Sequence, residues 1–179
     1  MNEDILKLVE SAKVDFQKNN FELAAKKFSQ SLEILQGSGS PEEIAEIQNN
    51  LGVALLRCSK PQDALNAVLG TDLIFAEAGD LQKQGIAFAN IASAYEALKD
   101  YENAALAYEK AIACFKESGD KKLRSITLRS LSDLQLKSGK EYVALATLQA
   151  SYDNKPDASI KDRFFSSALG RVMKKLIGQ

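Results

Sequence analysis

The side chains best suited to recognition chemistry are two asparagines, Asn50 and Asn90, which lie 40 residues apart in segments that read as amphipathic helices. A carboxamide offers a hydrogen-bond donor and an acceptor together. Each of them can therefore pair with the backbone of an extended peptide, whatever side chains the peptide carries. Asparagine also tolerates the solvated face of a helix without binding anything, and the sequence leaves both interpretations open.

Catalytic and metal-binding chemistry has little support in the sequence. The 179 residues include no histidine, which removes histidine-dependent triads and the commonest metal ligand. Cys58 and Cys114 lack CxxC spacing and fall on apolar helix faces, so we expect structural thiols in a reducing compartment. The acid pair Glu42-Glu43 stands at an expected helix start, where it favours the helix dipole. We therefore expect no enzyme, no cofactor and no metal site.

Charge and hydropathy narrow the class of partner. The net charge is −1 without any block of like charges, which argues against a general nucleic-acid binder. No apolar run approaches the roughly 18 residues that span a bilayer, and the first ten residues lack the apolar core of a signal peptide. We expect a cytoplasmic protein with a protein or peptide partner, and neither a nucleic-acid nor a membrane partner.

A period of 40 residues organises the elements that must position these side chains. Three columns keep this period without a gap: Ala12, Gly52, Ala92 and Ser132; Ala24, Ala64, Ala104 and Ala144; Phe28, Val68, Tyr108 and Leu148. The small residues stand where two helices would touch, and the large ones lie on the apolar face of a second helix. Several columns with one fixed period predict a solenoid of stacked helical hairpins.

We expect nine helices in a single domain over residues 1–179. They form four hairpins and a last helix, with these approximate bounds: 5–39, 40–79, 80–119, 120–156 and 157–177. The fourth hairpin is the weakest match, because Gln135 stands where the third has Tyr95.

Capping residues mark several of the expected helix starts. Ser40 to Glu43 reads as a capping box with proline at the first helical position, and Asp80 and Asp100 stand at N-cap positions. Pro61 begins the second helix of the second hairpin. We expect the apolar face of that helix to continue from Val68 through Phe75.

These columns resemble the tetratricopeptide repeat (TPR) family over nearly the whole chain. The third hairpin, FANIASAYEALKDYENAALAYEKAIACFKESG from Phe88 to Gly119, is the most specific match. The common repeat has 34 residues, and longer repeats of this kind are similar to those of kinesin light chain, spindle-orienting adaptors and bacterial peptide-sensing regulators. The resemblance implies an all-α, right-handed α-solenoid whose first helices line a concave groove. It also implies protein or peptide binding and usually no chemistry.

Helix geometry locates the groove that the resemblance implies. A residue two positions before Gly52 or Ala92 is rotated by about 200° from it, so Asn50 and Asn90 point away from the second helix of their hairpins. The candidate groove residues lie on this stripe or at its edge: Asn49, Asn50, Val53, Arg57, Ile86, Asn90, Ser93, Arg129 and Lys137.

Apolar and basic side chains on the same stripe would add to the amide contacts. Leu6, Val53, Ile86 and Ile126 supply the apolar ones. Arg57, Arg129 and Lys137 would form a loose basic patch towards an acidic partner, although Glu46 and Asp133 nearby favour solvated ion pairs. The family's chaperone-tail clamp is not matched, since Ile86 and Asn90 stand where it needs lysine and arginine.

The last expected helix has three interpretations. Its apolar stripe consists of Phe165, Leu169, Val172, Met173 and Leu176, and five basic residues lie off this stripe. The helix would cap the open face of the last hairpin, bind a membrane surface or a partner as a basic amphipathic helix, or begin a fifth, truncated repeat.

The sequence thus predicts an interaction scaffold or adaptor that binds a peptide or helical segment of a partner in the groove. One rival is a self-assembling module or sensor domain whose C-terminal helix mediates homo-oligomerisation. Two others are an enzyme with a helical fold and a nucleic-acid-binding helical repeat.

Overall fold

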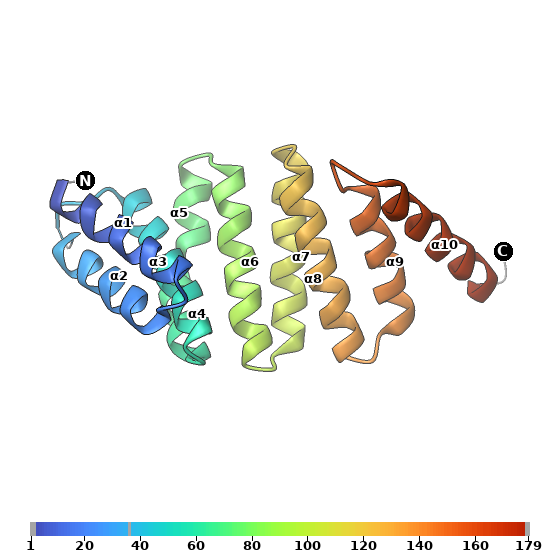
Figure 1. The fold of residues 1–179 in the computed structure, drawn as a ribbon, viewed down its shortest axis with the longest axis horizontal. Coiled ribbons are helices and arrows are strands. Elements are labelled where there is room, and N and C mark those ends of the chain that lie inside the picture. Colours follow the sequence, from blue (N-terminus) through green and yellow to red (C-terminus); the bar gives the residue numbers. More distant parts are fainter. Residues whose placement is uncertain (1–2, 36, 178–179) are drawn as a thin grey trace.

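The computed structural model describes residues 3–35 and 37–177, with side chains described as far as Lys175. These residues form α-helices and no strand. The helices stand side by side in one row (Figure 1), with these bounds: α1 (Glu3–Gln17), α2 (Phe21–Leu35), α3 (Pro41–Arg57), α4 (Pro61–Val68), α5 (Thr71–Glu77), α6 (Leu81–Ala97), α7 (Tyr101–Glu117), α8 (Lys121–Lys137), α9 (Glu141–Asp153) and α10 (Ile160–Ile177).

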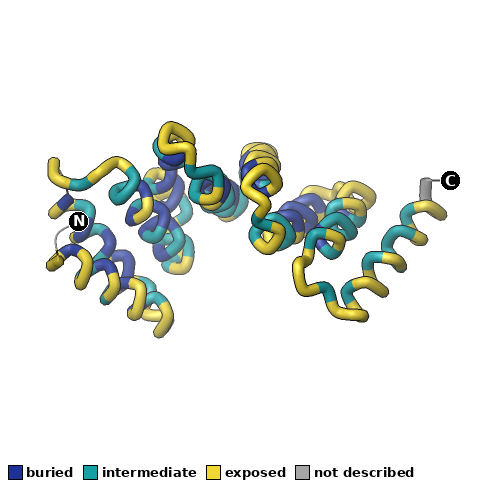
Figure 2. The backbone as a smooth tube through the Cα atoms, turned by 90° about the horizontal axis from the view of Figure 1, so that it is seen from above, coloured by how far each residue is buried: buried dark blue, intermediate teal, exposed yellow. Residues whose placement is uncertain are grey.

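Consecutive helices pack as hairpins, and each hairpin packs on the next, as α2 does on α3 and α7 on α8. The row is curved, and both of its ends bend towards the same side (Figure 2). Buried residues run through the middle of the row, between the helices. This architecture is the all-α solenoid that the 40-residue period predicts.

Local capping chemistry sets the helix starts, as the sequence predicts. The Glu43 amide donates to Ser40 Oγ at 3.2 Å and the Ser40 amide donates to Glu43 Oε2 at 3.1 Å, which completes the capping box. Asp80 and Asp100 accept hydrogen bonds from the backbone amides three residues later, at 2.9 and 3.2 Å. These side chains satisfy amides that the first turn of a helix leaves unpaired.

The short turns inside the hairpins require left-handed backbone at one repeating position. Asn19, Ser59 and Lys99 have φ of 62°, 58° and 65°, and Gly139 takes the same place with φ of 74°. Left-handed backbone costs a residue with a side chain about 1–2 kcal/mol. The turn geometry therefore repeats with the 40-residue period, even at Ser59 and Lys99, whose side chains disfavour positive φ.

The small-residue column lies at the closest helix contacts. Ala12 and Ala92 have no exposed surface. A Cβ placed on Gly52 would lie 2.3 Å from Val68 Cγ1 and 3.3 Å from the Ala64 carbonyl oxygen. Glycine is therefore required at the point where α3 crosses α4.

The second hairpin differs from the expectation of one continuous second helix. α4 ends at Val68 and α5 begins at Thr71, so the described residues form ten helices where nine were expected. Gly70 between them has φ of 86°, and the buried Thr71 hydroxyl donates to the Val68 carbonyl at 2.7 Å. Val68 and Phe75 are both buried as expected, but the helix is interrupted between them.

Candidate peptide-binding groove

The residues predicted for the groove lie on three helices. Asn49, Asn50, Val53 and Arg57 are on α3; Ile86, Asn90 and Ser93 are on α6; Arg129 and Lys137 are on α8. Asn49 is buried, whereas Ile86 and the three basic residues are exposed and the others are half-buried. We call the face of α1, α3, α6 and α8 that carries this stripe the candidate groove.

An amide bridge joins α3 to α6 and makes the two repeat-related asparagines unequal. Asn90 Nδ2 donates to Asn49 Oδ1 at 2.8 Å, and Asn49 Nδ2 donates to the Ala45 carbonyl at 2.9 Å. One of the two N–H groups of Asn90 is therefore already used, and the buried Asn49 holds the Asn90 side chain in place. Asn50 makes no hydrogen bond with any described residue, so both ends of its amide are available to a ligand.

Two hollows flank Asn50, and its side chain borders both. The first, of about 230 Å³, lies towards α1 and is lined by Lys13, Phe16, Gln17, Phe28, Asn50 and Val53. The second, of about 220 Å³, lies towards α6 and is lined by Glu46, Asn49, Asn50, Phe75, Lys83 and Ile86. Each combines aromatic or aliphatic surface with polar groups at its edge.

An ion pair crosses the second hollow. Lys83 donates to Glu46, and this hydrogen bond raises the pKa of the Lys83 ammonium. The same ammonium lies 5.9 Å from the centre of the Phe75 ring. Lys83 therefore links α3 to α6 across the hollow while its charge remains partly open to solvent.

A polar network ties α6, α7 and α8 together beside the groove. The buried Tyr108 hydroxyl donates to Glu96 Oε2 at 2.9 Å, and Lys137 Nζ donates to Glu96 Oε1 at 2.7 Å. Burial raises the pKa of Tyr108 to about 12. Ser93 lies 3.3 Å from the Tyr108 hydroxyl. Ser93 and Lys137 thus belong to this network, and both also stand on the predicted stripe.

The three basic groove residues have different surroundings. The Arg57 guanidinium lies 4.7 Å from the centre of the Phe21 ring, and Lys137 is paired with Glu96 at 2.7 Å. Arg129 has no ion pair among the described residues and lines a third cavity. Lys137 is thus ion-paired, but with Glu96 and not with Glu46 or Asp133, which the sequence had suggested.

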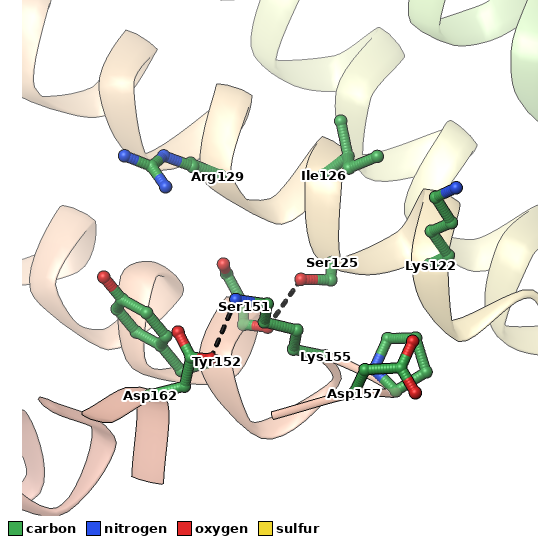
Figure 3. Close-up of a pocket in the computed structure, with 10 residues that line it drawn as sticks. Lys122, Ser125, Ile126, Arg129, Ser151, Tyr152, Lys155, Asp157 and Asp162 are labelled. Carbon is green, nitrogen blue, oxygen red and sulfur yellow. Dashed lines mark hydrogen bonds and ion pairs between the residues drawn. The ribbon is translucent and has the colours of Figure 1, made fainter. Parts of the chain in front are cut away.

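The third cavity, of about 390 Å³, lies between α8, the end of α9 and the start of α10 (Figure 3). Ile126 and Arg129 face it from one wall, and Tyr152 and the linker to α10 form the opposite wall. Ser125 Oγ donates to the Ser151 carbonyl at 2.8 Å below it. No spacing in the sequence predicts this cavity, because its far wall depends on how the chain turns after α9.

An ion pair forms part of the wall of this cavity. Lys155 Nζ lies 2.8 Å from Asp162 Oδ2, which also accepts hydrogen bonds from the amide and hydroxyl of Ser159. The hydrogen bond from Lys155 has the largest effect and those from Ser159 come next, and together they lower the pKa of Asp162 to about 2. The Tyr152 ring stacks on Phe165 with ring centres 6.2 Å apart.

The described residues offer no metal-binding group of three or more histidine, cysteine or acidic side chains. Burial raises the pKa of the thiols of Cys58 and Cys114, which keeps them protonated and weakly nucleophilic. No helix in the described part of the chain is both long and apolar enough to cross a membrane.

Comparison with known proteins identifies one family. Residues 2–175 match the family model described as soluble NSF attachment protein. No curated protein matches the chain by sequence.

Several solved structures share the fold at low sequence identity. The putative kinesin light chain of Podosopora anserina, with nearly identical TPR-like repeats, has 13% identity and a TM-score of 0.69, and the match covers 100% of both chains. Aspartyl phosphate phosphatase F of Bacillus subtilis has 16% identity and a TM-score of 0.75, over 98% of this chain and 46% of that one.

A third similar structure contains a peptide. The Rap conjugation gene regulator of the plasmid pLS20, in complex with the Phr* peptide, has 13% identity and a TM-score of 0.70, over 98% of this chain and 55% of that one. This chain thus spans about half the length of the phosphatase and of the regulator. At these identities the likeness establishes the fold, a TPR-like α-solenoid.

Proposed function

Because the chain belongs to the soluble NSF attachment protein family and has a TPR-like solenoid fold, we propose that it is a protein-interaction scaffold whose groove binds a segment of a partner protein. The binding element is a peptide or helical segment on the face of α1, α3, α6 and α8. We propose further that residues 1–179 act as one TPR unit in the cytoplasm, without a catalytic role.

One observation carries this proposal: Asn50 has a free amide and stands between two hollows. An extended peptide places alternate side chains on one face, roughly 7 Å apart. Two such side chains would enter the hollows on either side of Asn50, while the amide pairs with the backbone between them. Val53 and Ile86, one at the rim of each hollow, would contact the apolar parts of the ligand.

The cavity beside Arg129 extends the candidate groove towards α10. Ile126 and Tyr152 provide apolar surface there, and Lys122 and Arg129 provide positive charge, against one negative charge from Asp157; Lys155 and Asp162 pair with each other. A residue with an apolar body and a carboxylate nearby would match this combination. The pLS20 regulator, whose structure is a complex with the Phr* peptide, supports peptide binding as a use of this fold.

The test compares Asn50→Ala with Asn66→Ala, a matched control on α4 whose side chain is exposed. A partner would be captured from lysate of the source organism and identified by mass spectrometry. Its binding segment would then be titrated against the purified variants. We expect Asn50→Ala to weaken binding by about 1–3 kcal/mol, since it leaves a ligand backbone group unpaired. Asn66→Ala should bind as the unchanged protein does.

Asn90→Ala is less informative, because that change also breaks the bridge from α6 to Asn49. A partner segment that binds equally well to the Asn50→Ala and Asn66→Ala variants would place the binding site outside the groove and refute the proposal.

A further inference from the structure

The last helix, α10, leaves apolar side chains uncovered at the end of the solenoid. No residue of α10 is buried among those described, and Ile160 and Phe164 are 87% and 62% exposed. A helix that only caps a solenoid should present a polar outer face. Capping therefore explains the side of α10 that packs on α9, but it does not explain the exposed apolar residues on the opposite side.

The rotation of α10 on α9 determines which residues face outwards. Ser166 donates to Asp153 at 2.5 Å, and a Cβ on Gly170 would lie 3.0 Å from Gln149 Nε2, so this stripe faces α9. At about 100° per residue, Phe164 lies some 120° around the helix from Gly170. Ile160, one turn before Phe164, shares its side. Arg171 and Lys175 fall on the same outer face.

Positive charge on α10 is not balanced by the protein. The helix has five basic residues, Lys161, Arg163, Arg171, Lys174 and Lys175, and one acidic residue, Asp162, which is a net charge of +4 in a chain of net charge −1. Asp162 is already paired with Lys155 at 2.8 Å. None of the five basic side chains has an ion pair with a described residue.

We propose that α10 binds the surface of an anionic lipid bilayer. Ile160 and Phe164 would enter the boundary between headgroups and acyl chains, and the basic side chains would lie among the anionic headgroups. The proposal departs from the expectation of no membrane partner, which rested on the lack of an apolar run long enough to span a bilayer. Binding at the surface requires no such run.

Charge and the distribution of apolar residues favour a lipid surface over two other occupants. Two copies of α10 would repel one another, since each has a net charge of +4. The exposed apolar side chains of α10 are Ile160, Phe164, Phe165 and Val172. Around the helix they alternate with Lys161, Arg171 and Lys175 instead of forming one continuous apolar stripe. A partner helix needs such a stripe, whereas headgroups and acyl chains accept basic and apolar side chains that alternate.

The experiment is flotation of the full chain with vesicles of phosphatidylcholine alone or mixed with phosphatidylserine, at low and at physiological salt. We expect the chain to float with the mixed vesicles at low salt, less at higher salt, and not with phosphatidylcholine alone. Each cation near the surface contributes roughly a five-fold gain in affinity. Lys174→Gln/Lys175→Gln should therefore bind roughly thirty-fold more weakly, and Ile160→Asn/Phe164→Asn should also lose binding.

Matched variants elsewhere separate α10 from general effects of charge and polarity. Lys26→Gln/Lys60→Gln removes the same charge from exposed positions on other elements, and Leu73→Asn/Leu106→Asn makes a similar apolar-to-polar change. Both controls should bind as the unchanged chain does. Thermal melting by circular dichroism checks that every variant is folded.

A second readout uses the absence of tryptophan from the chain. Phe164→Trp should show a blue shift of its emission with mixed vesicles, whereas Leu73→Trp should not. Three results would overturn the proposal: no flotation with mixed vesicles at low salt, equal flotation with both vesicle types, or unchanged binding by both α10 double variants. If vesicles do not bind but capture of an acidic protein requires the same residues, α10 is a protein-docking helix instead. The groove proposal is independent of all these results.

Discussion

Replacing Gly52 by alanine tests the close helix contact on which the repeat depends. On an exposed helix this change stabilises by about 1 kcal/mol, because alanine has the higher helix propensity. Here the new methyl group would lie 2.3 Å from Val68 Cγ1, so α3 and α4 must separate or Val68 must leave its rotamer. Overpacking of this kind costs about 1–3 kcal/mol. Because this contact is much shorter than normal packing allows, the cost should lie in the upper part of that range. We therefore expect Gly52→Ala to destabilise the fold by about 2 kcal/mol net.

Urea unfolding followed by circular dichroism would measure this change, and a double-mutant cycle would assign it to the contact. In the Gly52→Ala background, Val68→Ala should cost less than it does alone, because the new methyl group occupies part of the space that valine vacates. The control is Gly170→Ala in α10. A Cβ there would meet only the flexible end of Gln149, at 3.0 Å, so this change should be neutral or stabilising.

Either of two results would refute the reasoning. One is that Gly52→Ala stabilises the protein as it would on an exposed helix. The other is that the effects of Gly52→Ala and Val68→Ala simply add, which would mean that the two residues do not share a contact. Asn50 lies two residues from Gly52 on α3, so a real displacement of α3 should also weaken ligand binding in the groove.

Three further predictions concern single positions. Gln135→Leu should stabilise the fold by about 1 kcal/mol in thermal melts, because Gln135 Oε1 is buried without a hydrogen-bond partner; a lower melting temperature would contradict this. Lys99→Gly should stabilise by about 0.5–1 kcal/mol in urea unfolding by relieving left-handed backbone at φ of 65°, whereas Lys110→Gly, within α7, should destabilise by about 1 kcal/mol. The pKa of Asp162 is lowered from 3.8 to about 2 by Lys155 and Ser159, so its contribution to stability is fully present above about pH 4 and is lost as the pH falls towards 2. The stability difference between Asp162→Asn and the unchanged protein should therefore shrink over that range, and a constant difference would count against the ion pair.

Several features of the groove depend on contacts that no periodicity encodes. The bridge between Asn49 and Asn90 joins residues 41 apart, and it forms only because of how α6 is rotated against α3. Sequence spacing placed Asn50 and Asn90 in equivalent positions, but this bridge uses one of the two N–H groups of Asn90 and leaves the Asn50 amide without a partner among the described residues. One feature of the sequence does hint at this difference. Asn49 and Asn50 are adjacent, and adjacent side chains on a helix lie on different faces, so the two amides have different surroundings.

The break between α4 and α5 and the cavity beside Arg129 were also not predicted. The break depends on the left-handed backbone of Gly70 and on the buried Thr71 hydroxyl, a local arrangement that the apolar column from Val68 to Phe75 conceals. The cavity depends on the linker after α9, where Lys155 and Asp162 meet.

The sequence by itself determined the class of fold, the repeat length and the main helix starts. Helix periodicity, N-caps such as Asp80 and Asp100, and small residues such as Ala92 act within a few residues or recur at a fixed spacing, so they can be read along the chain. Only the tertiary structure decided which amide is free, where the cavities lie and which face of α10 remains uncovered. These features depend on the rotation and separation of neighbouring helices, which arise from the sum of many packing contacts between residues far apart in sequence.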